Sequence, residues 1–94
     1  MIKPRIIDNE GNKYWFVHGI PHREGGPATV MTNGTEFWYN RGKLHRTDGP
    51  AVTYRNGFAL LYIENKKVTP KEYQHRLHLN DEFMLMLQLK YIFI

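Results

Sequence analysis

Residues 38–60 read WYNRGKLHRTDGPAVTYRNGFAL, and they repeat the 23 residues that precede them. Residues 15–37 read WFVHGIPHREGGPATVMTNGTEF, and the two stretches align without a gap. A match at one spacing, rich in residues with special backbone or side-chain properties, indicates an internal repeat that decides the whole fold. The identical pairs are Trp15 and Trp38, Gly19 and Gly42, His22 and His45, Arg23 and Arg46, Gly26 and Gly49, Pro27 and Pro50, Ala28 and Ala51, Asn33 and Asn56, and Gly34 and Gly57.

The same spacing extends beyond these two units. Pro4 and Gly11 fall in register with the later prolines and glycines, so the chain begins partway through an earlier unit. Residues 61–67 align with the start of the second unit, after which the pattern ends. We expect one domain of 94 residues, with hairpin repeats over residues 4–68 and a different C-terminal segment over residues 69–94.

Turn signals divide each unit into short strands. An Asn-Gly pair predicts a two-residue type I′ hairpin turn, because these residues tolerate positive φ best. The pairs are Asn33-Gly34 and Asn56-Gly57, with Glu10-Gly11 as a weaker version. A second series of turns is predicted at Gly19, Arg41-Gly42 and Asn65-Lys66. Closely spaced turns with β-favouring residues between them predict an antiparallel meander, whose hairpins must stack on one another to be stable.

The residue pattern changes at Thr69. Thr69, Pro70 and Glu72 stand at the N-cap, the first turn and the third helical position of a capping box, so a helix should begin at about Pro70. Its apolar stripe would contain Tyr73, Leu77 and Leu79. A break and a second helix start are predicted after this helix, with Asn80 or Asp81 as the cap.

Residues 83–94 are apolar on almost every side. They are too few to cross a membrane, which takes about 20 residues, and Gln88 and Lys90 interrupt them. We expect this segment to cover one face of the sheet and complete the core. Its surplus apolar face could then serve a homodimer, another partner or peripheral membrane contact, and residues 91–94 could form a short final strand instead of helix.

The repeated motifs resemble a known family. WYNRGKLH at residues 38–45, followed by YRNG at residues 54–57, is similar to the MORN repeat, a β-hairpin unit of the same length. HREGGPA at residues 22–28 and HRTDGPA at residues 45–51 resemble a MORN-like variant of small proteins and tandem arrays of bacteriophages and large viruses. The resemblance implies a single-sheet hairpin meander. Because such modules mostly bind or assemble, it also implies a binding element, although a fold does not assign site chemistry.

Composition excludes several classes of protein. The chain has no cysteine and no serine, which excludes disulfide scaffolds, cysteine zinc sites and nucleophiles of either type. It also lacks a P-loop, a His-Glu-x-x-His motif and a dinucleotide-binding glycine motif. The net charge of +4 is a mild bias towards anionic partners. With no apolar stretch after the first charged residues, we expect a cytoplasmic protein without a transmembrane segment, located in the host cytoplasm if it is viral.

Histidines are the strongest candidates for chemistry. His22 and His45 recur, each with an arginine after it, and a structural role would have each imidazole bond a turn backbone or Asp48. The following arginines, Arg23 and Arg46, either pair with acidic neighbours or face an anion. His75 and His78 have helical spacing for a shared metal, but no third ligand stands at a recognisable distance, so neither a metal site nor a cofactor is predicted.

We therefore predict a non-enzymatic α+β binding or adaptor module without catalytic residues. The expected contact residues for a protein partner are Arg23, Arg41, Arg46, Arg55, Tyr39 and Tyr62, while the recurring Trp, His, Gly and Pro residues are expected to be structural. The viral resemblance implies a small phage-encoded accessory protein that binds and modulates a host or viral protein. One alternative is RNA or DNA binding on a basic, aromatic sheet surface. The other is a small nuclease or hydrolase that uses His22 and His45.

Overall fold

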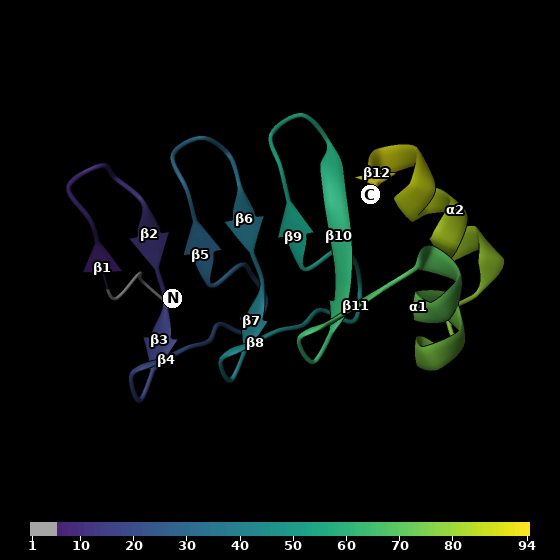
Figure 1. Cartoon of the computed structure of the whole chain (residues 1–94), viewed down its shortest axis with the longest axis horizontal. Coiled ribbons are helices and arrows are strands. Elements are labelled where there is room, and N and C mark those ends of the chain that lie inside the picture. Colours follow the sequence, from purple (N-terminus) through teal and green to yellow (C-terminus); the bar gives the residue numbers. More distant parts are fainter. Residues whose placement is uncertain (1–5) are drawn as a thin grey trace.

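The structure is a computed structural model that describes residues 6–94, so the register predicted for Pro4 lies outside it. The predicted α+β fold is confirmed. A row of antiparallel hairpins is followed by two helices that pack on it (Figure 1).

Short strands form the row of hairpins in the upper half of Figure 1. In spatial order they are β1 (Ile6–Ile7), β2 (Lys13–Tyr14), β5 (Thr29–Val30), β6 (Glu36–Phe37), β9 (Val52–Thr53) and β10 (Phe58–Ile63). Pairing repeats along the row: Lys13 lies opposite Val30, and the residues 23 positions later, Glu36 and Thr53, lie opposite each other. Neighbouring units therefore bond to one another in one continuous sheet, and the repeated spacing sets its register.

A second series of hairpins lies in the lower half of Figure 1. It consists of β3 (Phe16–Val17) with β4 (Ile20–Pro21), β7 (Tyr39–Asn40) with β8 (Lys43–Leu44), and β10 with β11 (Lys66–Val68). After each of the first two, the chain crosses back to the upper row through a loop. We call residues 22–27 the first loop and residues 45–50 the second loop.

The Asn-Gly turns differ from the prediction. Tyr54 donates its N–H to the Phe58 carbonyl and Gly57 donates to the Tyr54 carbonyl, so three residues lie in the loop. Gly57 has a φ of 94°, whereas Asn56 is not among the residues with positive φ. The two-residue type I′ prediction is therefore wrong. Each of these turns is a type I turn followed by a left-handed glycine, and the Asn56 side chain accepts the Phe58 N–H at 3.1 Å.

Type I′ turns occur at the other end of the hairpins. His18-Gly19, Arg41-Gly42 and Glu64-Asn65 each have positive φ at both positions and join paired strands through two residues. The predicted turn at Asn65-Lys66 therefore lies one residue earlier, and Lys66 belongs to β11. The sequence predicted the type I′ turn at the Asn-Gly pairs. However, glycine or asparagine at the second position of the other turns supports a type I′ turn equally well.

Two capped helices follow the repeats. α1 (Pro70–Leu77) begins as predicted, with the Thr69 hydroxyl accepting the Glu72 N–H at 3.1 Å. α2 (Asp81–Lys90) is capped by the Asn80 side chain, which accepts the Phe83 N–H at 2.8 Å. Both structures predicted for the end of the chain, a helix and a short final strand, are present. The strand, β12 (Ile92–Phe93), follows α2 and pairs in parallel with β10. In residues 6–94 no helix is long and apolar enough to cross a membrane.

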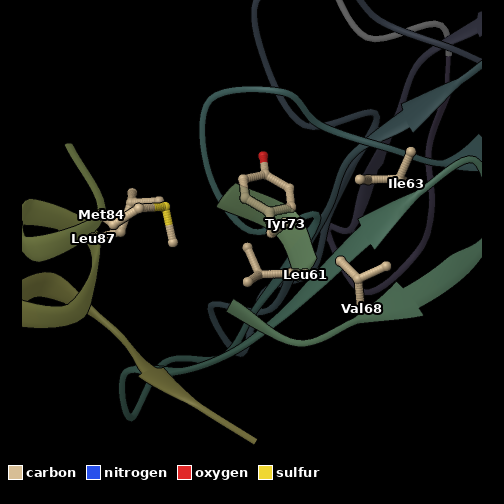
Figure 2. Packing of buried hydrophobic residues seen from close by; sticks show 6 residues of the cluster. All are labelled: Leu61, Ile63, Val68, Tyr73, Met84 and Leu87. Carbon is tan, nitrogen blue, oxygen red and sulfur yellow. The ribbon is translucent and has the colours of Figure 1, made fainter. Parts of the chain in front are cut away.

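The main apolar core lies at the C-terminal end of the row. It contains residues from β10, β11 and both helices: Leu61, Ile63, Val68, Tyr73, Met84 and Leu87 (Figure 2). The predicted stripe residues Leu77 and Leu79 pack against it. The helices lie beyond β10 in Figure 1, so they cover the last hairpin rather than a whole face of the sheet as expected. A helix of ten residues is about 15 Å long, whereas the longest dimension of the molecule is 40 Å. α2 is therefore too short to cover the whole row of hairpins.

Candidate functional site

A tryptophan and an arginine form the same stack in both complete units. The guanidinium carbon of Arg23 lies 3.9 Å from the centre of the Trp15 ring, and that of Arg46 lies 3.7 Å from the centre of the Trp38 ring. These distances are well within the range of a cation–π contact. Among the described residues neither indole N–H, although buried, has a hydrogen-bond partner. Packing and the arginine above it therefore hold each tryptophan in place.

The loop that follows each arginine explains the recurring Gly-Pro pair. Arg23 donates from Nη1 to the Pro27 carbonyl at 3.1 Å, and Arg46 makes the same bond to Pro50 at 3.1 Å. A Cβ atom on Gly26 would lie 2.7 Å from the Arg23 guanidinium carbon, and one on Gly49 would lie 2.9 Å from that of Arg46. Glycine leaves room for the stacked guanidinium. We call this arrangement of tryptophan, arginine, glycine and proline the clasp. The joint recurrence of the four residues was its signal in the sequence, but its geometry was not predicted.

Both repeated histidines bond to the turn of the following unit. His22 accepts the Arg41 N–H on Nδ1 at 2.9 Å, and His45 accepts the Glu64 N–H at 3.0 Å. These bonds assign the ring proton to Nε2. In the part of the chain that the structure describes, no carboxylate bonds to either imidazole. The imidazoles thus bridge neighbouring units through turn backbones rather than through Asp48.

The two arginines differ in their acidic neighbours. Arg46 donates from Nε to the Asp48 carboxylate at 2.8 Å, and its side chain is only 17% exposed. Within residues 6–94 Arg23 makes no ion pair with Glu24. Both guanidinium groups are held by tryptophan and proline, so neither projects freely towards solvent.

An open groove of about 570 Å³ lies between the first and second loops. Four of the six predicted contact residues line it, together with Glu24, and so do Lys43 and Glu64, which the sequence did not single out. The four are Arg23, Tyr39, Arg41 and Arg46. With four cationic side chains against two carboxylates, the lining carries a formal charge of +2, counting histidines as neutral. Arg41 and Lys43 are the exposed cations of the lining, whereas Arg23 and Arg46 are half-buried.

The other two predicted contact residues lie elsewhere. Arg55 lies in the turn between β9 and β10, at the upper end of the hairpins in Figure 1 and away from the groove. Tyr62 lies on β10, one unit beyond Tyr39. The exposed Arg55 and the half-buried Tyr62 therefore do not belong to one site with the groove residues.

The second loop is covered by α1 on its C-terminal side. The buried Tyr73 hydroxyl lies 2.5 Å from the Arg46 carbonyl oxygen, and it accepts the Gly49 N–H at 3.1 Å. Burial raises the pKa of Tyr73 to about 12. The hydroxyl is therefore a neutral hydrogen-bonding group that anchors α1 to the loop.

Asp8 organises the first described turn. Its carboxylate accepts hydrogen bonds from the Asn12 side chain and from the Tyr14 hydroxyl, each at 3.0 Å. The Asn12 amide contributes most to lowering the pKa of Asp8, and the bond to Asp8 raises the pKa of Tyr14. This network stabilises a hairpin turn at the opposite end of the row from α1.

His75 and His78 are both exposed, and His78 is the left-handed C-cap of α1. Residues 6–94 hold no group of three or more His, Cys, Asp or Glu side chains arranged for a metal ion. Comparisons with protein-family models, curated proteins and solved structures found no match to this chain. Function is therefore inferred from the geometry of the groove and the loops.

Proposed function

We propose that this protein is a non-enzymatic binding module that holds an acidic segment of a partner protein in the groove between its two loops. The observation that carries the proposal is the convergence of Arg23, Tyr39, Arg41 and Arg46 on one open groove. Arginine, tyrosine and tryptophan are the residue types that contribute most to protein-binding hot spots. The volume of the groove lies within the range of ligand pockets, which is about 300 to 1,000 Å³.

Rigidity of the groove supports the same function. One wall is tied to the next unit by the bond between His22 and the Arg41 N–H, and by the Gly42 N–H donated to the Pro21 carbonyl at 2.8 Å. Stacking on the tryptophan rings holds the guanidinium groups of Arg23 and Arg46 in the walls of the groove. A preformed site loses little conformational entropy when a ligand binds, so more of the contact energy appears as affinity.

Both imidazoles already use Nδ1 to hold turns, and in the described chain neither has the carboxylate partner that would orient a general base. This favours binding over hydrolysis as the role of the groove. The resemblance to the viral MORN-like variant extends the proposal: the partner is a host or viral protein, and the module is a phage-encoded accessory protein that modulates it in the cytoplasm.

Retention of a partner by matched variants tests this function. We expect the wild-type protein to retain one stoichiometric protein from extracts of its natural host after nuclease treatment. The variant Arg41→Glu/Lys43→Glu, which reverses the exposed groove cations, should lose that protein. Lys13→Glu/Lys67→Glu reverses two exposed cations outside the groove and should retain it. Equal retention by all three proteins, or no stoichiometric protein at all, would contradict the proposal.

Single-stranded nucleic acid is a second candidate ligand, favoured by a row of half-buried rings. Tyr14 stacks near Phe16 and Phe37 near Tyr39, both with ring centres 6.4 Å apart, and Tyr62 lies one unit further on. Such rings are platforms for bases. This candidate predicts affinity for a short oligonucleotide that falls steeply between about 50 and 200 mM salt. Arg23 and Arg46 support the loops, so the test variant is Arg41→Glu/Arg55→Glu, which should lose the oligonucleotide without disturbing them. Binding that is absent or does not depend on salt would reject nucleic acid as the ligand.

A further inference from the structure

α2 has two apolar faces. One face is buried in the core: Met84 and Leu87 are 5% and 3% exposed. The opposite face carries Leu85 and Leu89, which are 55% and 79% exposed. A helix that belongs to the surface of a monomer has polar residues on this side.

The exposed apolar side chains continue beyond the helix. Met86, Ile92 and Ile94 are each more than half exposed, so five such side chains occur within ten residues. Figure 1 places α2 next to α1 at the end of the molecule that lies beyond β10. Exposed large apolar side chains concentrated in one segment are typical of interaction sites on soluble proteins.

We propose that a second copy of this chain covers this face, with the two α2 helices antiparallel about a twofold axis. The charges at the ends of the helix are self-complementary in that arrangement. Glu82 precedes Leu85 and Leu89 at helical spacing on the outer face, whereas Lys90 ends the helix. Antiparallel pairing places Glu82 of each copy beside Lys90 of the other, and parallel pairing would place like charges together.

Both charged groups are available for this contact. Lys90 lies over the Tyr91 ring at 5.4 Å, which keeps its ammonium group near the end of the helix. Asp81 accepts a hydrogen bond from Gln74, whereas Glu82 is exposed and makes no ion pair within residues 6–94. The two helix dipoles also oppose each other in the antiparallel arrangement.

The charge pattern of α2 also favours a second copy of the chain over a membrane as the partner of this face. Helices that lie on anionic membranes carry several lysines or arginines on their polar side. α2 carries Asp81 and Glu82 at one end and a single lysine at the other. This balanced pattern fits a second copy better than an anionic lipid surface.

Molar mass measured by sedimentation equilibrium from about 1 µM to 1 mM tests the dimer. We expect a concentration-dependent monomer–dimer equilibrium in the wild-type protein. Leu89→Glu should raise the dissociation constant at least a hundredfold, because it places two charges in the apolar contact. Leu89 is 79% exposed, so the variant should keep its circular dichroism spectrum and melting temperature. A wild-type monomer at 1 mM, or an unchanged dimer in Leu89→Glu, would overturn the proposal.

Charge reversal tests the antiparallel arrangement. Glu82→Lys and Lys90→Glu should each weaken the dimer about tenfold, because each converts two attractive contacts into repulsive ones. The double variant Glu82→Lys/Lys90→Glu should recover most of the loss, and the distant control Lys13→Glu should leave the dimer unchanged. A double variant that is no tighter than either single variant would reject the arrangement. Association with vesicles of anionic lipid in place of self-association would reject the second copy as the occupant.

Discussion

The two loops between the hairpin rows are built by the same clasp but face different surroundings. In both, an arginine stacks on a tryptophan, bonds to a proline carbonyl and lies against a glycine. Both loops line the open groove, but only the second is also fixed by the Tyr73 hydroxyl of α1 and by the ion pair between Arg46 and Asp48. The same clasp thus occurs in one loop that α1 holds in place and in another that no helix of residues 6–94 covers.

The backbone shows one further difference between the loops. Gly25 has a φ of 77°, whereas Asp48, 23 residues later, is not in the left-handed region. Asp48 can therefore direct its carboxylate to Arg46, and glycine in the first loop leaves no side chain there. This position accounts for the additional ion pair in the second loop without changing the clasp.

Removal of the Tyr73 side chain should have the largest effect on stability and on the difference between the two loops. Tyr73→Ala deletes a fully buried ring and its bonds to the second loop, so we expect a loss of about 3 to 5 kcal/mol in the free energy of unfolding. Urea denaturation measures this loss. Hydrogen exchange should show that the second loop opens first while the first loop stays protected, and equal loss of protection in both loops would contradict the difference between them.

Alanine at the clasp glycines should have the next largest effect. Gly26→Ala and Gly49→Ala each force the arginine off its tryptophan, and because its side chain can move without the backbone, we expect losses of about 1 to 2 kcal/mol. Gly49→Ala should cost more, since its backbone also bonds to Tyr73. Thermal denaturation checks the order, and a costlier Gly26→Ala would show that the contact between Tyr73 and the second loop is unimportant.

High pH should weaken the contact between Tyr73 and the second loop and leave the clasp of the first loop unchanged. The folded pKa of Tyr73 is about 12, above the unfolded value of about 10, so its contribution is complete below pH 10 and is lost as pH rises towards 12. Urea midpoints between pH 9 and pH 12 should therefore fall more steeply for the wild-type protein than for Tyr73→Phe. Parallel curves for the two proteins would exclude this cause.

Histidine substitutions should affect both loops equally and modestly. His22→Ala and His45→Ala each remove one bond to an exposed turn N–H, which water can replace, so we expect losses of about 0.5 to 1.5 kcal/mol. Lower melting temperatures with a retained fold would indicate structural histidines. Unchanged stability combined with loss of partner binding, or of nuclease activity, would assign them a direct functional role.

The smallest expected effect is at Asp48. Its carboxylate is 71% exposed, so Asp48→Asn should lower stability by less than about 1 kcal/mol, and the difference should shrink at high salt. Glu24→Gln neutralises the acidic residue of the first loop and should change nothing measurable, because Arg23 has no ion pair with Glu24 among the described residues. Equal effects in the two loops would remove this part of the comparison.

Much of the fold was predictable because the turns and caps are local. The capping box at Thr69 and Pro70 located α1, and the repeated spacing indicated a meander of hairpins. The turn types were assigned to the wrong ends of the hairpins, because Asn-Gly is compatible with two different turns. Four groove residues were named from the sequence, but Arg55 was grouped with them although its turn lies at the other end of its hairpin.

The sequence by itself determined which residues recur, where the repeats give way to helices and approximately where the chain turns, since each depends on interactions between residues close along the chain. Only the tertiary structure decided which loop is covered by α1, that the two loops face one groove, and which face of α2 stays exposed. Those outcomes depend on where α1 and α2 come to rest against the last hairpin, and burial of Tyr73, Met84 and Leu87 sets that position through contacts with distant parts of the chain.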